Sequence, residues 1–385
     1  MTSGIRRRAL ALLIGTHVVD DLYQGTVPAL LPFLVAERHY GYAQAAGITL
    51  AATFLSSLLQ PAFGVLTDRR RRPWLIGAGL LTAGVGIGLC GLSAGYWTTW
   101  AAVALSGMGV AAYHPEASAA ARSAAGASAQ GMSLFAVGGN TGIALAPLIV
   151  APVLGTTGLI GTPLLAIPAM AMALYLAVAR REPAPGRVRA AHAPQDDDWR
   201  SFRRLTVAVV CRSIAYFGVS SFLALLLIHR FGVSKGTASV ALTVFTGTGA
   251  AGTVLGGRLA DRLGRLPTVR IGYVLTVPGL LGLLLAPGPA VAFVAAFVLG
   301  LGLYVPFSVH TTLGQEYLPG RIGTASGVTL GLAVSAGGMV APLLGLVADA
   351  YGIRAAIALL LVLPVTALAV SARLPETRVP LETTG

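Results

Sequence analysis

Long apolar segments recur along the whole chain and are separated by short polar stretches. A helix needs about 20 apolar residues to cross a bilayer. Twelve segments meet that length: residues 9–36, 43–66, 74–93, 97–121, 128–154, 158–179, 204–229, 236–259, 268–286, 289–316, 323–348 and 352–373. They are continuously apolar, whereas the strands of a membrane β-barrel alternate apolar and polar residues. The pattern predicts an all-α integral membrane protein with twelve transmembrane helices.

Composition agrees with this pattern. Of the 385 residues 55% are hydrophobic and only 11% are charged, and the mean hydropathy is +0.77. The 49 glycines would weaken helices in water, but in lipid small residues let neighbouring helices approach closely. The two cysteines, Cys90 and Cys211, have no metal-ligand spacing, so neither a metal nor a cofactor is expected.

The distribution of basic residues predicts the orientation of the chain. The formal net charge of +13 could indicate nucleic-acid binding, but 22 of the 27 Lys and Arg residues lie at the termini or in alternate loops on the same side as the termini. That bias is typical of cytoplasmic loops. It places both termini in the cytoplasm and excludes nucleic acid as a partner.

The two halves of the chain resemble each other. Gly64 and Asp68 in "GVLTDRRRRP" recur 193 residues later as Gly257 and Asp261 in "GGRLADRLGRLP". Six helices per half is an even number, so both halves would have the same orientation, as a parallel repeat. We therefore expect two pseudo-symmetric six-helix bundles, residues 1–180 and 204–385, joined by a polar cytoplasmic linker, residues 181–203.

The repeated loop has the pattern Gly-x-Leu-x-Asp-Arg-x-Gly-Arg. The second copy matches it at every position, whereas Arg71 replaces the glycine in the first copy. This loop resembles the signature of the major facilitator superfamily. The resemblance implies a cytoplasmic gating latch, made by Gly64, Asp68, Arg69, Gly257, Asp261, Arg262, Gly264 and Arg265.

Four further stretches resemble one branch of that superfamily, the fosmidomycin-resistance exporters of bacteria. They are "DLYQGTVPALLPFL", "YHPEASAAAR", "SLFAVGGNTG" and "CRSIAYFG". The resemblance covers all twelve segments and implies a drug exporter in the bacterial plasma (inner) membrane.

The first helix carries an unusual polar stripe. His17, Asp20, Asp21 and Gln24 are spaced i, i+3, i+4 and i+7, so they share one helical face. A charged residue at the bilayer centre costs about 2.5–3.5 kcal/mol on insertion scales, so this face should meet a partner or a wet cavity. An aspartate that only pairs with a cation to join two helices is the alternative.

Arg212 in the seventh helix is the expected counterpart. It lies at the position related to residue 19 by the 193-residue repeat, and its planar group suits phosphonate or carboxylate. Binding of an anion and a structural ion pair with Asp20 both remain open. The resemblance implies that the first, fourth, seventh and tenth helices line a central cavity.

The fourth helix adds Tyr113, His114 and Glu116 around Pro115. Proline removes a backbone hydrogen bond and favours a kink. On an unbroken helix Tyr113 and Glu116 share a face while His114 points elsewhere, which favours Glu116 over His114 for the cavity. Other expected lining residues are Asn140, Tyr216 and Tyr304.

These features predict a proton-coupled antiporter. Asp20, Asp21, Glu116 and His114 would carry the proton, while His17, Gln24, Tyr113, Asn140, Arg212, Tyr216 and Tyr304 would bind a small anionic or zwitterionic substrate. Binding of the proton would disfavour binding of the substrate, and the reverse, in an alternating-access cycle. The chain would act as a monomer in the lipid bilayer, driven by the proton gradient.

Other functions have less support. The sequence has no phosphate-binding loop, nucleophile elbow or zinc spacing, so it does not indicate an enzyme or an ATP-driven pump. A proton-coupled importer would use the same residues. A non-transporting receptor is a further alternative, although the short termini and linker argue against it.

Overall fold

The computed structural model describes residues 3–69, 71–92, 95–125, 129–179, 196–321, 324–325 and 327–376. All regular secondary structure in these ranges is helical. The predicted fold class, an all-α membrane protein, is confirmed.

The first half contains six membrane-crossing segments. They are α1 (Ser3–Arg38), α2 (Tyr42–Arg69), α3 (Trp74–Cys90), α4 (Tyr96–Ala125), α5 (Ala129–Thr157) and a sixth, in which the 3₁₀ helix η1 (Leu159–Ala166) continues into α6 (Ile167–Ala179). Helices α1 and α4 are less apolar than α3 because they carry the polar residues found in the sequence.

The second half also contains six. They are α7 (Trp199–Phe231), α8 (Lys235–Leu263), α9 (Arg265–Leu285), α10 (Pro289–Tyr317), an eleventh in which the π-helix η3 (Gly327–Leu332) precedes α12 (Ala333–Tyr351), and a twelfth made of α13 (Ile353–Leu359) and α14 (Val362–Ser371). A short 3₁₀ turn, η2 (Pro319–Arg321), follows α10. Each predicted segment therefore corresponds to one crossing.

Helix α7 begins earlier than the hydrophobic pattern indicated. It starts at Trp199 rather than at residue 204, because the Asp198 side chain accepts the backbone N–H of Ser201 at 3.0 Å and caps the helix. Of the predicted linker, residues 181–203, the part from 181 to 195 lies outside the described residues.

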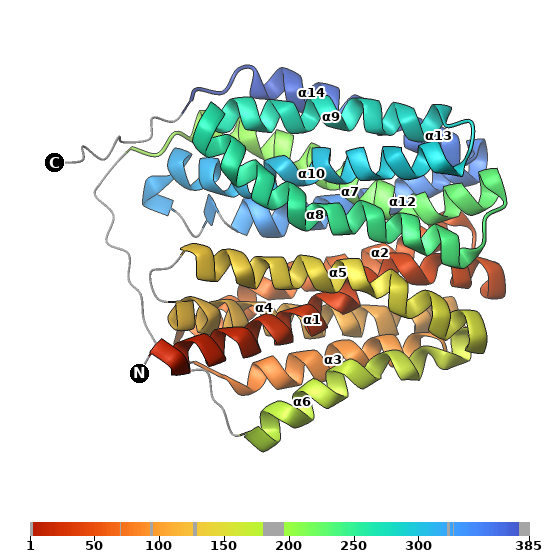
Figure 1. Cartoon of the computed structure of the whole chain (residues 1–385), viewed down its shortest axis with the longest axis horizontal. Helices are drawn as coiled ribbons and strands as arrows, with labels where there is room; N and C mark the ends of the chain where they lie inside the picture. The colour runs from red at the N-terminus through yellow and green to blue at the C-terminus, as the bar shows by residue number, and fades with distance from the viewer. Residues whose placement is uncertain are drawn as a thin grey trace.

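The two halves form two groups of helices that run side by side (Figure 1). Helix α1 begins and α14 ends at one end of the molecule, which we call the terminal end (left in Figure 1); the opposite end is the far end. Helices α2 and α5 of the first group contact α12 and α8 of the second, respectively.

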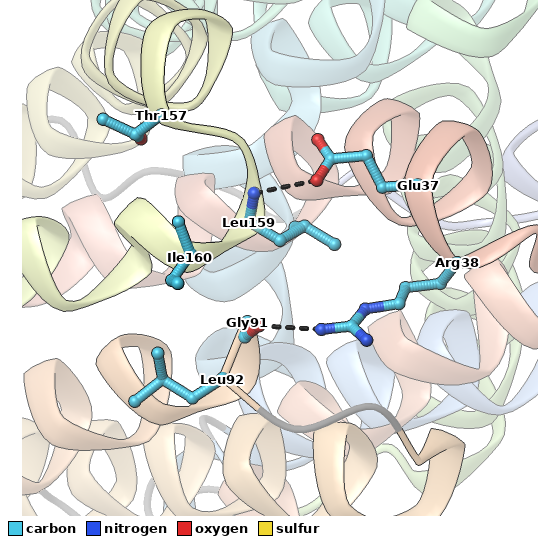
Figure 2. A pocket seen from close by; sticks show the side chains of 7 residues that line it. All are labelled: Glu37, Arg38, Gly91, Leu92, Thr157, Leu159 and Ile160. Atoms are coloured by element: carbon cyan, nitrogen blue, oxygen red, sulfur yellow. Dashed lines mark hydrogen bonds between the residues drawn. The ribbon is translucent and has the colours of Figure 1, made fainter.

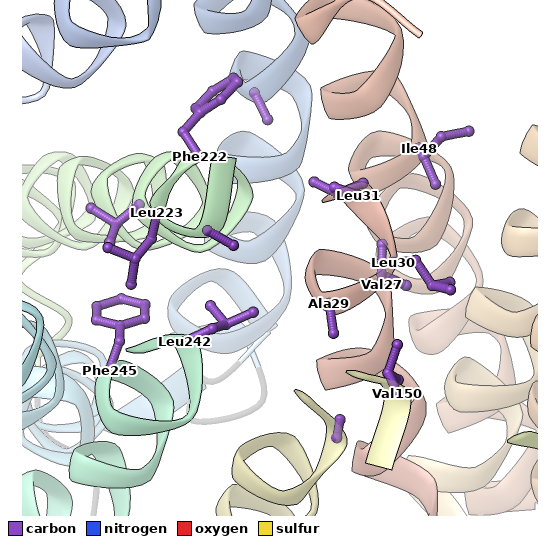
Figure 3. Packing of buried hydrophobic residues seen from close by; sticks show 14 of the residues in the cluster. Val27, Ala29, Leu30, Leu31, Ile48, Val150, Phe222, Leu223, Leu242 and Phe245 are labelled. Atoms are coloured by element: carbon purple, nitrogen blue, oxygen red, sulfur yellow. The ribbon is translucent and has the colours of Figure 1, made fainter. Parts of the chain in front are cut away.

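A shared apolar core joins the groups. Figure 3 shows Leu30 and Leu31 of α1 on one side and Phe222, Leu223 and Phe245 of α7 and α8 on the other. All five belong to one buried cluster that draws residues from both halves. A second cluster, which includes Phe202, Leu313 and Tyr317, belongs to the second half alone.

Three hydrogen bonds also link the groups. The carboxylate of Asp349, near the end of α12, accepts the backbone N–H groups of Tyr42 at 2.7 Å and Ala43 at 2.9 Å. These N–H groups belong to the first turn of α2, which leaves them without a partner in their own helix. In addition, the hydroxyl groups of Thr49 and Ser221 lie 3.1 Å apart.

Glycines bring α1 against α5. A Cβ atom added at Gly25 would lie 2.8 Å from the Cα of Ile143, and one at Gly142 would meet the backbone of Val18 and Leu22. Such close approach is what small residues permit in membrane helices. It sets the backbone of α5 directly beside the polar stripe of α1.

Candidate functional site

The polar stripe of α1 forms one connected cluster. Asp21 Oδ2 lies 3.3 Å from His17 Nε2, and Gln24 donates a hydrogen bond to Asp21 Oδ1. His17, Asp20 and Asp21 are buried, whereas Gln24 is exposed. The stripe therefore turns inward along most of its length and reaches accessible space at Gln24.

Helix α4 brings His114, rather than Glu116, to the aspartates. His114 Nδ1 lies 3.3 Å from Asp20 Oδ2, and its Nε2 lies 3.4 Å from Asp21 Oδ1. The helix continues through Pro115 without a break, but α1 packs against the face that carries His114. The assumption that His114 points elsewhere is therefore wrong.

Tyr113 fastens the same two helices. Its hydroxyl lies 2.8 Å from that of Thr16, which itself donates to the carbonyl of Leu13 at 2.8 Å. Because Thr16 donates its hydroxyl proton to Leu13, Tyr113 is the donor in the hydrogen bond between the two hydroxyl groups. Tyr113 has no exposed surface, which favours a structural over a substrate-binding role.

Helix α5 completes the cluster from the third side. The carbonyl of Phe135 lies 2.7 Å from His17 Nδ1, and the Phe135 ring stacks on the imidazole at 4.1 Å. Gly139 lies where a side chain would collide with Asp21 and His17. Asn140, the next residue, is half-buried.

Asp20 is the most deeply enclosed acid of the cluster. It is 0% exposed, and neither carboxylate oxygen has a hydrogen-bond donor among the described residues. The 3.3 Å contact with His114 Nδ1 is an electrostatic one, because that nitrogen faces the carbonyl of Val110 at 3.0 Å.

The structure places Glu116 apart from this cluster. Its Oε1 lies 2.7 Å from Arg71 Nε, and its Oε2 accepts the backbone N–H of Arg72 at 3.1 Å. Arg71 and Arg72 connect α2 to α3 at the terminal end. Glu116, favoured over His114 for the cavity, therefore contacts Arg71 and Arg72 rather than the aspartates of α1.

Arg212 lies among aromatic rings in the second half. Its guanidinium is 4.9 Å from the centre of the Phe307 ring, and its Nη1 is 3.5 Å from the carbonyl of Leu303. The residue is 6% exposed, and its Nε has no hydrogen-bond partner in the part of the chain that the structure describes. No carboxylate of a described residue pairs with it, so the expected Arg212–Asp20 pair is not formed.

Two tyrosines lie near Arg212: Tyr216 is one turn further along α7, and the ring of Tyr304 lies 6.3 Å from that of Phe307. The two tyrosine rings meet edge to face at 5.6 Å, and Tyr216 stacks on Phe245 at 5.7 Å. Helix α1, which carries the acidic cluster, contacts α7 and α8. The acidic cluster of one half and the arginine of the other therefore lie on helices that contact each other.

The second copy of the repeated loop shows why it contains glycine. Gly264 has φ +92°, a conformation that favours glycine, and Arg265 pairs with Glu316. Asp261 and Arg262 are exposed. In the first copy Arg71 does not have a positive φ and binds Glu116 instead.

The other positions of the gating motif are less informative. A Cβ atom at Gly64 or Gly257 would meet nothing within 4 Å. The side chains of Asp68 and Arg69 lie outside the described residues, and the predicted latch stays a prediction.

Two acidic residues were missed by sequence reasoning. Asp349 joins the groups at the far end, and Glu37 accepts the backbone N–H of Leu159 at 2.9 Å beside a small pocket of about 380 Å³ (Figure 2). Arg38, across that pocket, donates to the carbonyl of Gly91 at 2.9 Å. The sequence gives little indication of either residue, because Asp349 and Glu37 both bind backbone N–H groups rather than a basic side chain.

These features define a membrane transporter built from two six-helix groups that face a polar centre. The chain belongs to the Major Facilitator Superfamily, whose family model matches residues 12–342. Members of this family move small molecules and are not enzymes.

Two curated proteins are similar along most of their length. The fosmidomycin resistance protein of Escherichia coli (strain K12) is 31% identical over 344 residues, 87% of this chain and 84% of that protein. An uncharacterized MFS-type transporter of Bacillus subtilis (strain 168), YfnC, is 31% identical over 370 residues, with coverage of 92% and 90%.

A solved structure supports the fold. A bacterial homologue of the human lysosomal transporter Spinster, in an inward-facing and occupied conformation, superimposes with a TM-score of 0.83. It is 17% identical, with 96% of this chain and 97% of that chain covered. At this identity the likeness concerns the fold alone.

Proposed function

We propose that this protein is a secondary active transporter that exports a small anionic or zwitterionic compound, such as a fosmidomycin-like phosphonate, in exchange for protons. The two helix groups, residues 1–180 and 204–385, would rock about the shared centre. The observation that carries the proposal is the buried Arg212, which has no carboxylate partner among the described residues.

A buried charge without a counter-charge is costly. Leaving one partner of a buried ion pair alone typically costs about 3–5 kcal/mol, and charged residues inside membranes mark substrate or ion pathways. Arg212 keeps its charge at any physiological pH, and its fork of donors matches a phosphonate or a carboxylate. An anionic substrate would supply the missing negative charge.

The aromatic rings suit the same role. Phe307 supports the guanidinium from one side, while Tyr216 and Tyr304 offer apolar faces and hydroxyl groups to the rest of the substrate. Gln24 and Asn140 would provide polar contacts from the first half, with His17 behind them. A zwitterion could place its cationic group toward Asp21.

We infer export because the similar protein of Escherichia coli is a fosmidomycin resistance protein. Efflux needs energy, and the chain has no nucleotide-binding motif, so an ion gradient is the natural source. We infer the proton gradient, with the terminal end in the cytoplasm. The individual proton-coupling roles of Asp20, Asp21, His114 and Glu116 stay predictions.

A proton-coupled importer is the second candidate. It would use the same arginine, because alternating access depends only on different affinities in the two states. The sign of the gradient that drives accumulation separates the two candidates.

Purified protein in sealed liposomes would test the proposal. Radiolabelled fosmidomycin is followed while the pH gradient is imposed in either direction, for wild type, Arg212→Ala and Arg212→Lys. We expect movement opposite to the proton flux, at least a tenfold loss in Arg212→Ala, and partial activity in Arg212→Lys, which keeps the charge but not the fork. Arg200→Ala, an exposed arginine at the start of the same helix, should transport normally.

Two results would contradict the proposal. Normal transport by Arg212→Ala would remove the anion role of the arginine. Accumulation in the direction of the proton flux would indicate the importer.

A further inference from the structure

We propose that His17, Asp21 and His114 form a binding site for one divalent transition-metal ion of the Zn²⁺ class, which joins α1 to α4. This goes beyond anion transport and does not depend on it. Among the described residues, these three make the one group of His, Cys, Asp and Glu side chains compact enough to hold a metal, with ligand atoms within 4.8 Å of one another.

The spacing of the ligand atoms fits a tetrahedral ion. Metal–nitrogen and metal–oxygen distances of about 2.0–2.1 Å place neighbouring tetrahedral ligands about 3.3 Å apart. Asp21 Oδ2 lies 3.3 Å from His17 Nε2, and Asp21 Oδ1 lies 3.4 Å from His114 Nε2. The two contacts use different oxygens of Asp21 and the ligand atoms lie within 4.8 Å of one another, so rotation of the side chains would bring all three groups onto one ion.

Both imidazoles are oriented as metal ligands are. His17 Nδ1 is 2.7 Å from the carbonyl of Phe135, and His114 Nδ1 is 3.0 Å from the carbonyl of Val110. A carbonyl only accepts, so each Nδ1 carries a proton, and in the neutral imidazole Nε2 then presents its lone pair to Asp21. This outer hydrogen bond is what fixes the tautomer of a metal-binding histidine.

The arrangement needs a positive charge between its members. In neutral imidazoles two lone pairs face a carboxylate, and this repulsion is relieved either by protons on the imidazoles or by a metal ion between the three groups. Two histidines and one carboxylate suit zinc or another d-block ion, whereas Mg²⁺ and Ca²⁺ prefer oxygen ligands. Three protein ligands leave a fourth position for water or an incoming anion.

An ion can reach this position. The side chain of His114 is 20% exposed, and those of His17 and Asp21 are each 9% exposed. Gln24, which donates to Asp21, is itself exposed.

The test is a metal titration of the full chain, purified in detergent with a tag that lacks histidine and stripped with a chelator. Co²⁺ is added and its visible d–d absorption is followed, and Zn²⁺ is then used to displace it. We expect one ion per chain with the intense spectrum of a tetrahedral site. His17→Gln, Asp21→Asn and His114→Gln should each weaken binding at least about tenfold.

Two variants make the outcome specific. His114→Cys should add a sulfur-to-cobalt charge-transfer band, which appears only if residue 114 ligates the ion. His229→Gln, an exposed histidine at the other end of the molecule, should bind as the wild type does.

The inference is overturned if the stripped chain binds no ion stoichiometrically, in which case protons alone occupy the cluster. It is also overturned if His114→Cys binds cobalt without the new band. Because no anion and no gradient are used, these results are independent of the transport test on Arg212.

Discussion

Arg71 Nε lies 2.7 Å from Glu116 Oε1, and the backbone N–H of Arg72 donates to the other carboxylate oxygen of Glu116 at 3.1 Å. The carboxylate of α4 thereby holds the connection between α2 and α3. Glu116 is 0% exposed, so these two contacts take the place of water around its carboxylate.

Replacing Glu116 should therefore affect stability more than substrate recognition. Glu116→Gln loses the charge but keeps one acceptor, and we expect a loss of about 1–3 kcal/mol, seen as a lower thermal unfolding temperature in detergent. The transport KM should change less than twofold in the protein that remains folded.

A double-mutant cycle gives the control for Glu116. Arg71→Gln combined with Glu116→Gln should cost less than the sum of the two single changes, because the residues contact each other. Additive losses, or a KM raised tenfold in Glu116→Gln, would instead support direct involvement of Glu116 in transport.

Opening of the far end should depend on Asp349. Its carboxylate binds the N–H groups of Tyr42 and Ala43 from the opposite half, and charge-assisted bonds of this kind are worth about 1.5–3 kcal/mol. Asp349→Ala should shift the population toward a state open at the far end by about tenfold or more. Distances between spin labels on α2 and α12 would measure it.

The matched variant is Asp349→Asn, which keeps one acceptor oxygen and should shift the population less. Unchanged distance distributions in Asp349→Ala would show that the apolar contacts between α2 and α12 suffice to hold that end closed.

Gly139→Ala should disturb the cluster directly. The added methyl group would collide with Asp21 and His17, and packed helices relax only partly, at a cost of typically 1–3 kcal/mol. We expect transport to fall at least tenfold and the cobalt spectrum to change. Gly155→Ala, in the same helix with nothing within 4 Å, should leave both as in wild type.

Acid should weaken the start of α7. The hydrogen bonds from Ser201 to the Asp198 carboxylate lower its pKa below the usual range. The cap is therefore fully present above the ordinary aspartate pKa, about 3.9, and is lost as pH falls through the lower folded value. The difference in unfolding temperature between wild type and Asp198→Asn should be constant at neutral pH and shrink below about pH 4; a difference that grows on acidification would contradict this.

Sequence alone determined the fold class and the membrane crossings. Twenty-residue apolar stretches have few alternatives in a bilayer, because every backbone group must be satisfied within its own helix. For the same reason the polar stripe from His17 to Gln24 could be placed on one face from its spacing alone. The repeat that relates Gly64 to Gly257 could be recognised equally well, because it lies in the amino-acid sequence itself.

Tertiary structure decided which polar groups meet. Helical spacing predicts the face of a residue within its helix, but the rotation of each helix is set by packing. Here α1 approaches α5 closely at Gly25 and Gly142, and α3 approaches α4 closely at Gly79 and Gly109. That rotation brings His114 to Asp20 and Asp21 and leaves Glu116 to Arg71. It also leaves Arg212 among aromatic rings without an acidic partner among the described residues, which no pattern along the chain could reveal.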